Sequence, residues 1–287
     1  NWDAGVIFTE GNDAVFGGTG ETVTIDEPGG IEVGDVTFDV DGYSIIGNDL
    51  EVTGTISVTN AADSATIEAN ISSDVVIGGD GTVALAGDTT GTLTTAGGAD
   101  IDGDITGNLI SSGTTTLAGD VSGTVAQSAG SVTVDGASTL TGAVTISGGS
   151  FTASAQTTLG AGLSNDGTLD IDAAVLGAQT LTNTGTATIG ANITGSFVQN
   201  TDAAATTIVD GVANVSGGLD IDTGTLTVSA ALTGDVDVAA GASYDQNDGL
   251  TGTLTTAGGA DIDGDITGNL ISSGTTTLAG DVSGTVA

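Results

Sequence analysis

Aspartate is the residue type whose spacing in this sequence indicates chemistry. Pairs of the form Asp-x-Asp occur at 39/41, 100/102, 170/172, 220/222, 235/237 and 261/263. Residues two apart in a β-strand lie on the same face, so each pair would present two carboxylates outward around an inward apolar residue. A second spacing, of 16 positions, relates Asp88, Asp104 and Asp120, and also Asp265 and Asp281. In stacked strands these side chains would form columns of like charge about 4.8 Å apart, which is unfavourable in isolation.

Two interpretations of these carboxylates compete. Clustered carboxylate oxygens are ligands that calcium prefers, and a bound cation would cancel the repulsion between turns. The candidate ligands are Asp100, Asp102, Asp104, Asp120, Asp261, Asp263, Asp265 and Asp281. The string DIDGD at 100–104 and 261–265 lacks the full EF-hand spacing, so a solvated acidic face, screened by salt within about 8 Å, stays open as the alternative. Calcium is therefore the one cofactor that the sequence suggests.

The composition excludes most catalytic classes. The chain has 287 residues, 37 Asp and Glu, no Lys, Arg, His or Cys, and a formal charge of −37. Neither a Ser-His-Asp nor a Cys-His constellation can be built, and no Lys can form a Schiff base. Paired carboxylates can hydrolyse glycosides, but we expect aromatic platforms and a cation beside them, and the chain has one Trp and two Tyr. We therefore expect no enzymatic activity.

The same composition limits the partners. Without a basic side chain the protein would be repelled by nucleic acid and by anionic membrane surfaces. No apolar run approaches the roughly 20 residues of a membrane helix, so we expect no membrane insertion.

The sequence is built of repeats. Residues 90–126 and 251–287 are identical, at an offset of 161 positions. Inside this long repeat, apolar residues recur every 16 positions, and elsewhere the period lengthens to about 17–19. The columns are Leu93, Leu109 and Val125; Ile101 and Leu117; and Ile105 and Val121.

These periods predict an all-β fold, a parallel β-helix (β-solenoid) with rungs of about 16–19 residues. At about 17 residues per turn the chain would make roughly 17 turns, with each column stacked into an inner apolar ladder. A helical fold is disfavoured because each Gly would cost roughly 1 kcal/mol, and the chain has 50 of them. A β-sandwich also fits regular strands and turns, but its antiparallel pairing needs no fixed stacking period.

Composition divides the chain once. All Glu residues lie within the first 68 positions. We therefore separate an N-terminal β-helical segment, 1–68, from a repetitive solenoid, 69–287, that contains the 161-residue super-repeat. The first copy of the repeat continues with QSAGSVTVDG whereas the second stops at Ala287, so we expect a longer natural array.

The N-terminal segment resembles a known family. Trp2, NDAVFGG at 12–18, TVTID at 22–26 and VGDVTFDVDGYSI at 33–45 are similar to the autotransporter-associated β-strand repeat of bacterial surface proteins. The remainder resembles repetitive adhesin passengers in composition and period. The resemblance implies an extracellular β-helix on the bacterial cell surface, although the β-barrel translocator of that family does not occur in this sequence. Phe38 and Tyr43 would supply aromatic bulk, or would cover the end of the apolar ladder.

The predicted function is structural. We expect a rigid β-solenoid that forms a surface fibre, filament or adhesin shaft and associates with itself end to end or laterally, because exposed strand edges can pair with another copy. Two alternatives stay open: an adhesive autotransporter passenger that binds a cell-surface or matrix ligand, and a calcium-dependent surface-layer or matrix protein. An adhesive loop would interrupt the period, and the widest irregularity is at 200–214.

Overall fold

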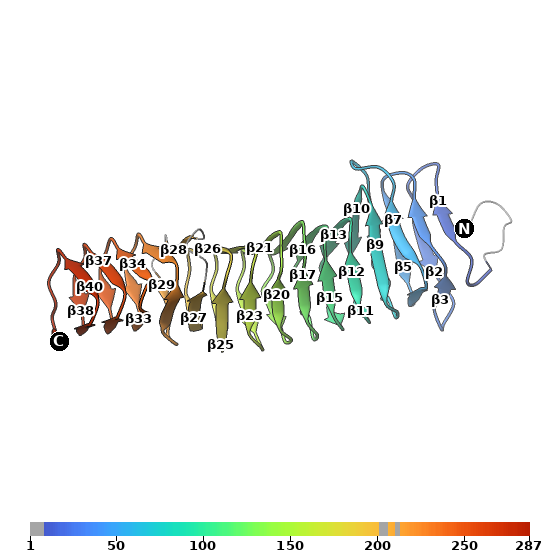
Figure 1. The fold of residues 1–287 in the computed structure, drawn as a ribbon. Coiled ribbons are helices and arrows are strands. Elements are labelled where there is room, and N and C mark those ends of the chain that lie inside the picture. The colour runs from blue at the N-terminus through green and yellow to red at the C-terminus, as the bar shows by residue number, and fades with distance from the viewer. Residues whose placement is uncertain (1–8, 201–205, 210–212) are drawn as a thin grey trace. The chain divides into compact units, whose positions relative to one another are not determined.

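A computed structural model describes residues 9–200, 206–209 and 213–287, and all regular elements within these ranges are β-strands (Figure 1). The chain divides into two compact units, 1–141 and 142–287. In each unit parallel strands stack turn upon turn, as the all-β solenoid prediction requires. Trp2 and most of the 200–214 irregularity lie outside the described residues.

In unit 1 a turn contributes three strands, and each strand pairs in parallel with its equivalents in the neighbouring turns. The first stack is β1 (Ala14–Phe16), β4 (Val36–Phe38), β7 (Thr55–Val58), β9 (Val75–Gly79), β12 (Leu93–Thr95), β15 (Leu109–Ser111) and β17 (Val125–Gln127). The second is β2 (Thr22–Ile25), β5 (Tyr43–Gly47), β8 (Ser64–Ile67), β10 (Thr82–Leu85), β13 (Gly98–Ile101), β16 (Thr114–Leu117) and β18 (Ser131–Val134). The third is β3 (Ile31–Val33), β6 (Leu50–Val52), β11 (Thr89–Thr90), β14 (Ile105–Thr106) and β19 (Ser138–Leu140), joined by single bridges at Ile71 and Val121.

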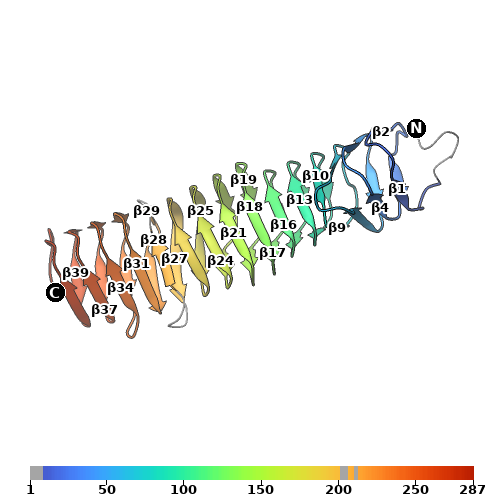
Figure 2. The ribbon, with the colours of Figure 1, turned by 90° about the horizontal axis from the view of Figure 1, so that it is seen from above.

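Unit 2 repeats this plan (Figure 2). Its first stack is β20 (Val144–Ile146), β23 (Leu163–Asn165), β25 (Val175–Asn183), β27 (Ile193–Asn200), β30 (Leu219–Thr223), β33 (Val236–Val238), β36 (Leu254–Thr256) and β39 (Leu270–Ser272). Its second is β21 (Ser150–Ala153), β24 (Thr168–Ile171), β26 (Thr186–Ile189), β28 (Thr206–Val209), β31 (Thr225–Val228), β34 (Ser243–Gln246), β37 (Gly259–Ile262) and β40 (Thr275–Leu278). Its third is β22 (Thr157–Leu159), the first residues of β25 and β27, β29 (Ala213–Asn214), β32 (Leu232–Thr233), β35 (Leu250–Thr251) and β38 (Ile266–Thr267).

The predicted apolar ladder is confirmed. Leu93 pairs with Leu109 and Leu109 with Val125, each 16 positions on. All three side chains are buried, at 0%, 0% and 1% exposure. Every second residue of a strand points into the core and packs against the equivalent residue of the next turn. Each apolar side chain is therefore buried mainly by the neighbouring turns and not by its own.

The predicted number of turns is too high. The two units together contain about 14 turns instead of 17. The early turns are longer than the predicted 16–19 residues, since Thr22 pairs with Ser44 and Tyr43 with Ala65, 22 positions apart in both cases. From Ser64 to Thr82 the step falls to 18 residues, so the rungs shorten near the end of the 1–68 segment.

Aromatic rings fill the wider early turns. The rings of Phe16 and Phe38 stack with centroids 5.0 Å apart, and the ring of Tyr43 lies 5.2 Å from that of Phe16. The Tyr43 hydroxyl donates a hydrogen bond to the carbonyl of Gly17 at 2.7 Å. A longer turn encloses more space, and these side chains supply the volume that Leu and Val provide in shorter rungs.

No helix with the length and apolarity needed to cross a membrane occurs in the described ranges.

Candidate functional site

The structure places all eight predicted calcium ligands on the surface. Asp100, Asp102, Asp104, Asp120, Asp261, Asp263, Asp265 and Asp281 are exposed. The Asp-x-Asp geometry is as expected: Asp100 and Asp102 point outward while Ile101 between them is 1% exposed. The repeat at Asp261 and Asp263 has the same arrangement.

The 16-residue column of aspartates is a hydrogen-bonded ladder. Oδ1 of Asp88 accepts a bond from the backbone N–H of Asp104 at 2.9 Å, and Oδ1 of Asp104 accepts one from the N–H of Asp120 at 2.9 Å. Asp120 in turn accepts the N–H of Thr139 at 2.6 Å. Each carboxylate therefore meets a backbone donor of the next turn, which offsets the like-charge stacking expected from the sequence.

The ladder does not require charge at every step. Oδ1 of Asn70 accepts the N–H of Asp88 at 3.1 Å, which adds an amide to the same column. A second column joins turns in the same way, with Oδ1 of Asn108 accepting the N–H of Thr124 at 2.9 Å. Unit 2 repeats both columns through the bonds from Asp281 N–H to Asp265 and from Thr285 N–H to Asn269, each 2.9 Å. The shared requirement is a short side chain that carries an oxygen acceptor.

Within the part of the chain that the structure describes, the acidic residues do not gather into a metal centre. Among residues 9–200, 206–209 and 213–287, no three acidic side chains lie together in a group that could hold a metal ion. Asp104, Asp120 and Asp265 each direct an oxygen at backbone N–H groups, which leaves that oxygen engaged. Calcium binding by these residues stays a prediction.

Asp100 differs electrostatically from the ladder residues. Its partial burial raises the pKa of its carboxyl, and the neighbouring charges of Asp102 and Asp135 raise it further. Asp41 shows the opposite: the backbone N–H of Ser64, 2.8 Å from Oδ1, and then the Ser64 hydroxyl lower its pKa. Asp100 thus lies in a locally negative environment that is poorly compensated by donors.

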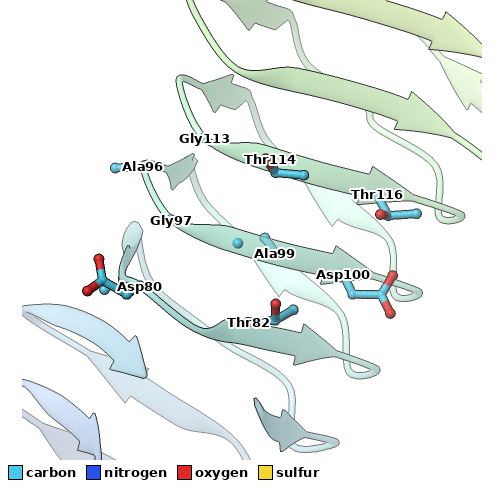
Figure 3. A pocket seen from close by; sticks show the side chains of 11 residues that line it. Asp80, Thr82, Ala96, Gly97, Ala99, Asp100, Gly113, Thr114 and Thr116 are labelled. Atoms are coloured by element: carbon cyan, nitrogen blue, oxygen red, sulfur yellow. The ribbon is translucent and has the colours of Figure 1, made fainter. Parts of the chain in front are cut away.

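A surface hollow of about 520 Å³ lies over β13, beside Asp100 (Figure 3). It arises because the outward position of β13 that pairs with Thr82 and Thr114 is Gly98, which has no side chain. Figure 3 shows Thr82 and Thr114 on either side of this strand and Asp80 and Asp100 toward opposite ends. The lining residues are Gly79, Asp80, Thr82, Ala96, Gly97, Gly98, Ala99, Asp100, Gly113, Thr114 and Thr116. We call this feature the β13 hollow.

The β13 hollow was not foreseen in the sequence. Its signal is faint: one strand of the second stack has Gly at an outward position where its two neighbours have Thr. Gly98 is seen to lie between Thr82 and Thr114 only when the register of the three strands is known. The sequence period alone does not give that register.

A buried polar ladder was also missed. Asn165 donates from Nδ2 to Oδ1 of Asn183 at 2.6 Å, and Asn183 donates to Oε1 of Gln199 at 3.0 Å. All three side chains are 0% exposed. Alternation was the available signal, because Asn165 lies two positions after inward Leu163 and shares its face. The hydrogen bonds satisfy these buried amides, so the ladder is structural.

Comparison with known proteins gives one informative similarity. No protein-family model matches the sequence, and no solved structure matches it. A stretch of 90 residues is 37% identical to the Adhesin BmaC autotransporter of Brucella suis biovar 1 (strain 1330). The match covers 30% of this chain and 3% of that adhesin. The similarity and the solenoid fold are compatible with an adhesin-like autotransporter passenger, and they leave the family of the chain unassigned.

Proposed function

We propose that this chain is a non-enzymatic β-solenoid segment of a bacterial cell-surface adhesin, exposed outside the cell. The observation that carries the proposal is the stacked parallel solenoid of each unit, together with its partial similarity to an autotransporter adhesin. Because the match spans 3% of that adhesin, nothing about its ligands is transferred to this chain.

The mechanical role follows from how the turns are joined. Backbone ladders run through three stacks in each unit, and side-chain acceptors such as Asp104 and Asn108 add bonds between successive turns. A quasi-one-dimensional stack of this kind resists local opening through nearest-neighbour contacts. The solenoid would thus serve as a stiff shaft or display scaffold.

The composition suits an exposed location. The chain has no Lys or Arg and therefore offers no cleavage site to trypsin-like proteases. Its charge of −37 keeps copies apart at low salt and favours solubility. Self-association end to end or laterally stays a prediction, to be tested by sedimentation velocity over a concentration series at physiological salt.

Surface labelling and adhesion assays test the proposal. Antibody raised against the purified chain should label intact cells of the source bacterium, and lysis should not raise the signal greatly. Beads coated with the chain should adhere to host or neighbouring cells more than beads coated with an unrelated protein of similar negative charge. Labelling that requires lysis contradicts the surface location, and equal adhesion of the two bead types contradicts the adhesin role.

A further inference from the structure

We propose that the β13 hollow binds amino sugars that carry a free ammonium group, as single units or in short polymers. This inference rests on the proposed adhesin role and names the class of ligand that such an adhesin would engage.

The shape of the hollow suits a ring-sized ligand. It is an open, mostly polar hollow of about 520 Å³, in which a sugar ring could lie with one face exposed to solvent. The floor is the backbone of Gly97 and Gly98, so a ligand can approach the sheet closely there. Thr82 and Thr114 stand on the two neighbouring strands in register with Gly98 and form the walls.

The polar groups of the hollow are available for a ligand. The hydroxyls of Thr82, Thr114 and Thr116 line it, and none of these three hydroxyls is hydrogen-bonded to another group of the described chain. A Thr hydroxyl both donates and accepts, which matches the hydroxyls of a sugar ring. The carboxylates of Asp80 and Asp100 only accept, so they match ammonium and hydroxyl donors.

Charge selects an ammonium-bearing sugar over a neutral or acidic one. The chain carries 37 acidic residues and no cation, so acidic polysaccharides would be repelled. Asp100 is partly desolvated and faces the like charges of Asp102 and Asp135, and these effects raise the pKa of its carboxyl. A cation beside Asp100 would relieve that unfavourable arrangement. An N-acetylated sugar keeps the ring and its hydroxyls, but it gains an acetyl group and loses the positive charge that would meet Asp100.

Part of this surface recurs in unit 2, where Gly241 and Ser243 stand in place of Asp80 and Thr82. Residues 257–277 are identical to 96–116, and Gly259 lies in register between Ser243 and Thr275 as Gly98 lies between Thr82 and Thr114. Asp261 and Thr277 repeat Asp100 and Thr116. A test must therefore change both copies together.

Isothermal titration calorimetry of the full 287-residue chain at physiological salt tests the inference. The probes are a trimer of β-linked glucosamine with free amines and the corresponding N-acetylated trimer. We expect the free-amine trimer to bind, and the acetylated trimer to bind at least about tenfold more weakly, the loss of roughly one charge-assisted contact. Equal affinity for the two trimers, or no binding of the free-amine trimer, overturns the proposal.

Matched variants locate the site. Asp100→Asn with Asp261→Asn removes two charges, and Thr114→Val with Thr275→Val removes two hydroxyls while it preserves shape. Each pair should weaken binding of the free-amine trimer at least about fivefold. The control pair, Glu51→Gln with Asp172→Asn, removes the same charge elsewhere on the exposed surface and should change affinity less than about twofold. Circular dichroism confirms that all variants are folded.

The outcomes separate this inference from the proposed function. An equal loss of affinity in the control pair would show attraction by diffuse charge only and would overturn the site. If beads coated with the doubly changed Asp100 and Asp261 variant adhere to cells as strongly as wild type, the adhesin role stands and the hollow is not its ligand site.

Discussion

At the scale of single residues, the aspartates of this protein act mainly as hydrogen-bond acceptors between turns. Asp88 accepts the backbone N–H of Asp104, and Asp104 accepts the backbone N–H of Asp120. Both N–H groups lie directly before a strand or bridge of the third stack. Asn70 and Asn108 do the same without charge. This role explains a regular 16-residue spacing without a metal ion, because the acceptor must recur once per turn.

Substitution of Asp104 tests that role. Asp104→Ala removes the acceptor for the Asp120 N–H and should destabilise the chain by about 1 kcal/mol, seen as a lower urea midpoint. Asp104→Asn retains an Oδ1 acceptor and should cost less than about 0.5 kcal/mol. Asp102→Ala is the control, because Asp102 is exposed and accepts no hydrogen bond from the described residues. Equal effects of the two alanine variants would contradict the ladder interpretation.

Asp220 gives a pH-dependent prediction. Its partial burial raises the pKa of its carboxyl, and Asp237, directly opposite on β33, and then Asp222 raise it further. The folded state therefore binds this proton more tightly than the unfolded state, so stability falls as pH rises through the unfolded and folded pKa values. Asp220→Asn should raise the melting temperature at pH 7, and the gain should vanish below pH 3.8, the ordinary pKa of an Asp carboxyl.

Asp41 should show the opposite pH dependence to Asp220. The pKa of Asp41 is lowered by its bonds from Ser64, so Asp41→Asn should lower the melting temperature at pH 7 and lose that effect as pH falls through the lowered pKa. A melting-temperature shift of the same sign in the two variants at pH 7 would contradict these assignments.

At the scale of elements, the turn between strands depends on glycine columns. A Cβ on Gly107 would lie 1.9 Å from the carbonyl oxygen of Gly91, one turn earlier. Gly123 continues the column, and its N–H donates to the carbonyl of Gly107 at 2.8 Å. The backbones of successive turns approach so closely here that only hydrogen fits in place of a side chain.

Gly107→Ala tests the column. The added methyl group must push two turns apart and should destabilise the chain by about 1–3 kcal/mol, measured as a lower thermal midpoint. Gly17→Ala is the matched control, since a Cβ there meets no atom within 4 Å. A melting temperature for Gly107→Ala as high as that of the Gly17→Ala control would show that the turns separate at little cost.

The sequence predicts the strands and the apolar ladder of each turn, but not the length of the early turns or the buried amide side chains. The strands, their parallel stacking and the Leu93–Leu109–Val125 ladder follow from alternation and a period of 16. The 22-residue early turns could not be predicted, because no exact repeat in that part of the sequence reveals their register. The buried Asn183 was missed because polar side chains are expected outside, and only its partners across turns make burial tolerable.

At the scale of the whole molecule, the net negative charge is left largely uncompensated by the protein itself. The chain has 37 acidic side chains and no basic one, so no cross-strand ion pair can form. Backbone donors satisfy some carboxylates locally, but long-range repulsion between rungs is left to mobile ions.

Salt should therefore stabilise the fold. Between about 10 mM and about 150 mM sodium chloride the screening length falls from roughly 30 Å to roughly 8 Å, and the melting temperature should rise. Circular dichroism melts in sodium chloride and in choline chloride separate general screening from sodium binding. A melting temperature independent of salt would contradict this account of the charge.

Calcium is tested against that background. Since no convergent acidic group occurs in the described part of the chain, calcium chloride should raise the melting temperature by little more than a sodium salt of equal ionic strength. A much larger rise that Asp104→Asn with Asp265→Asn abolishes would instead establish the calcium site predicted from the sequence. Magnesium at the same concentration is the control for divalent charge.

The sequence by itself determined the fold class, the stacking of turns, and the outward orientation of the acidic pairs, because strand alternation and repeat period are local properties of the chain. Tertiary structure decided which neighbour each residue meets. Asp100 and Asp261 occupy the same position of identical 37-residue segments, yet Asp100 pairs with Ala84 of the preceding turn and Asp261 pairs with Asp245. The inward neighbours differ as well, because Ala99 pairs with Val83 whereas the equivalent Ala260 pairs with Tyr244. In a solenoid, burial, acceptor partners and hollows depend on the adjacent rung, and that rung is specified elsewhere in the chain.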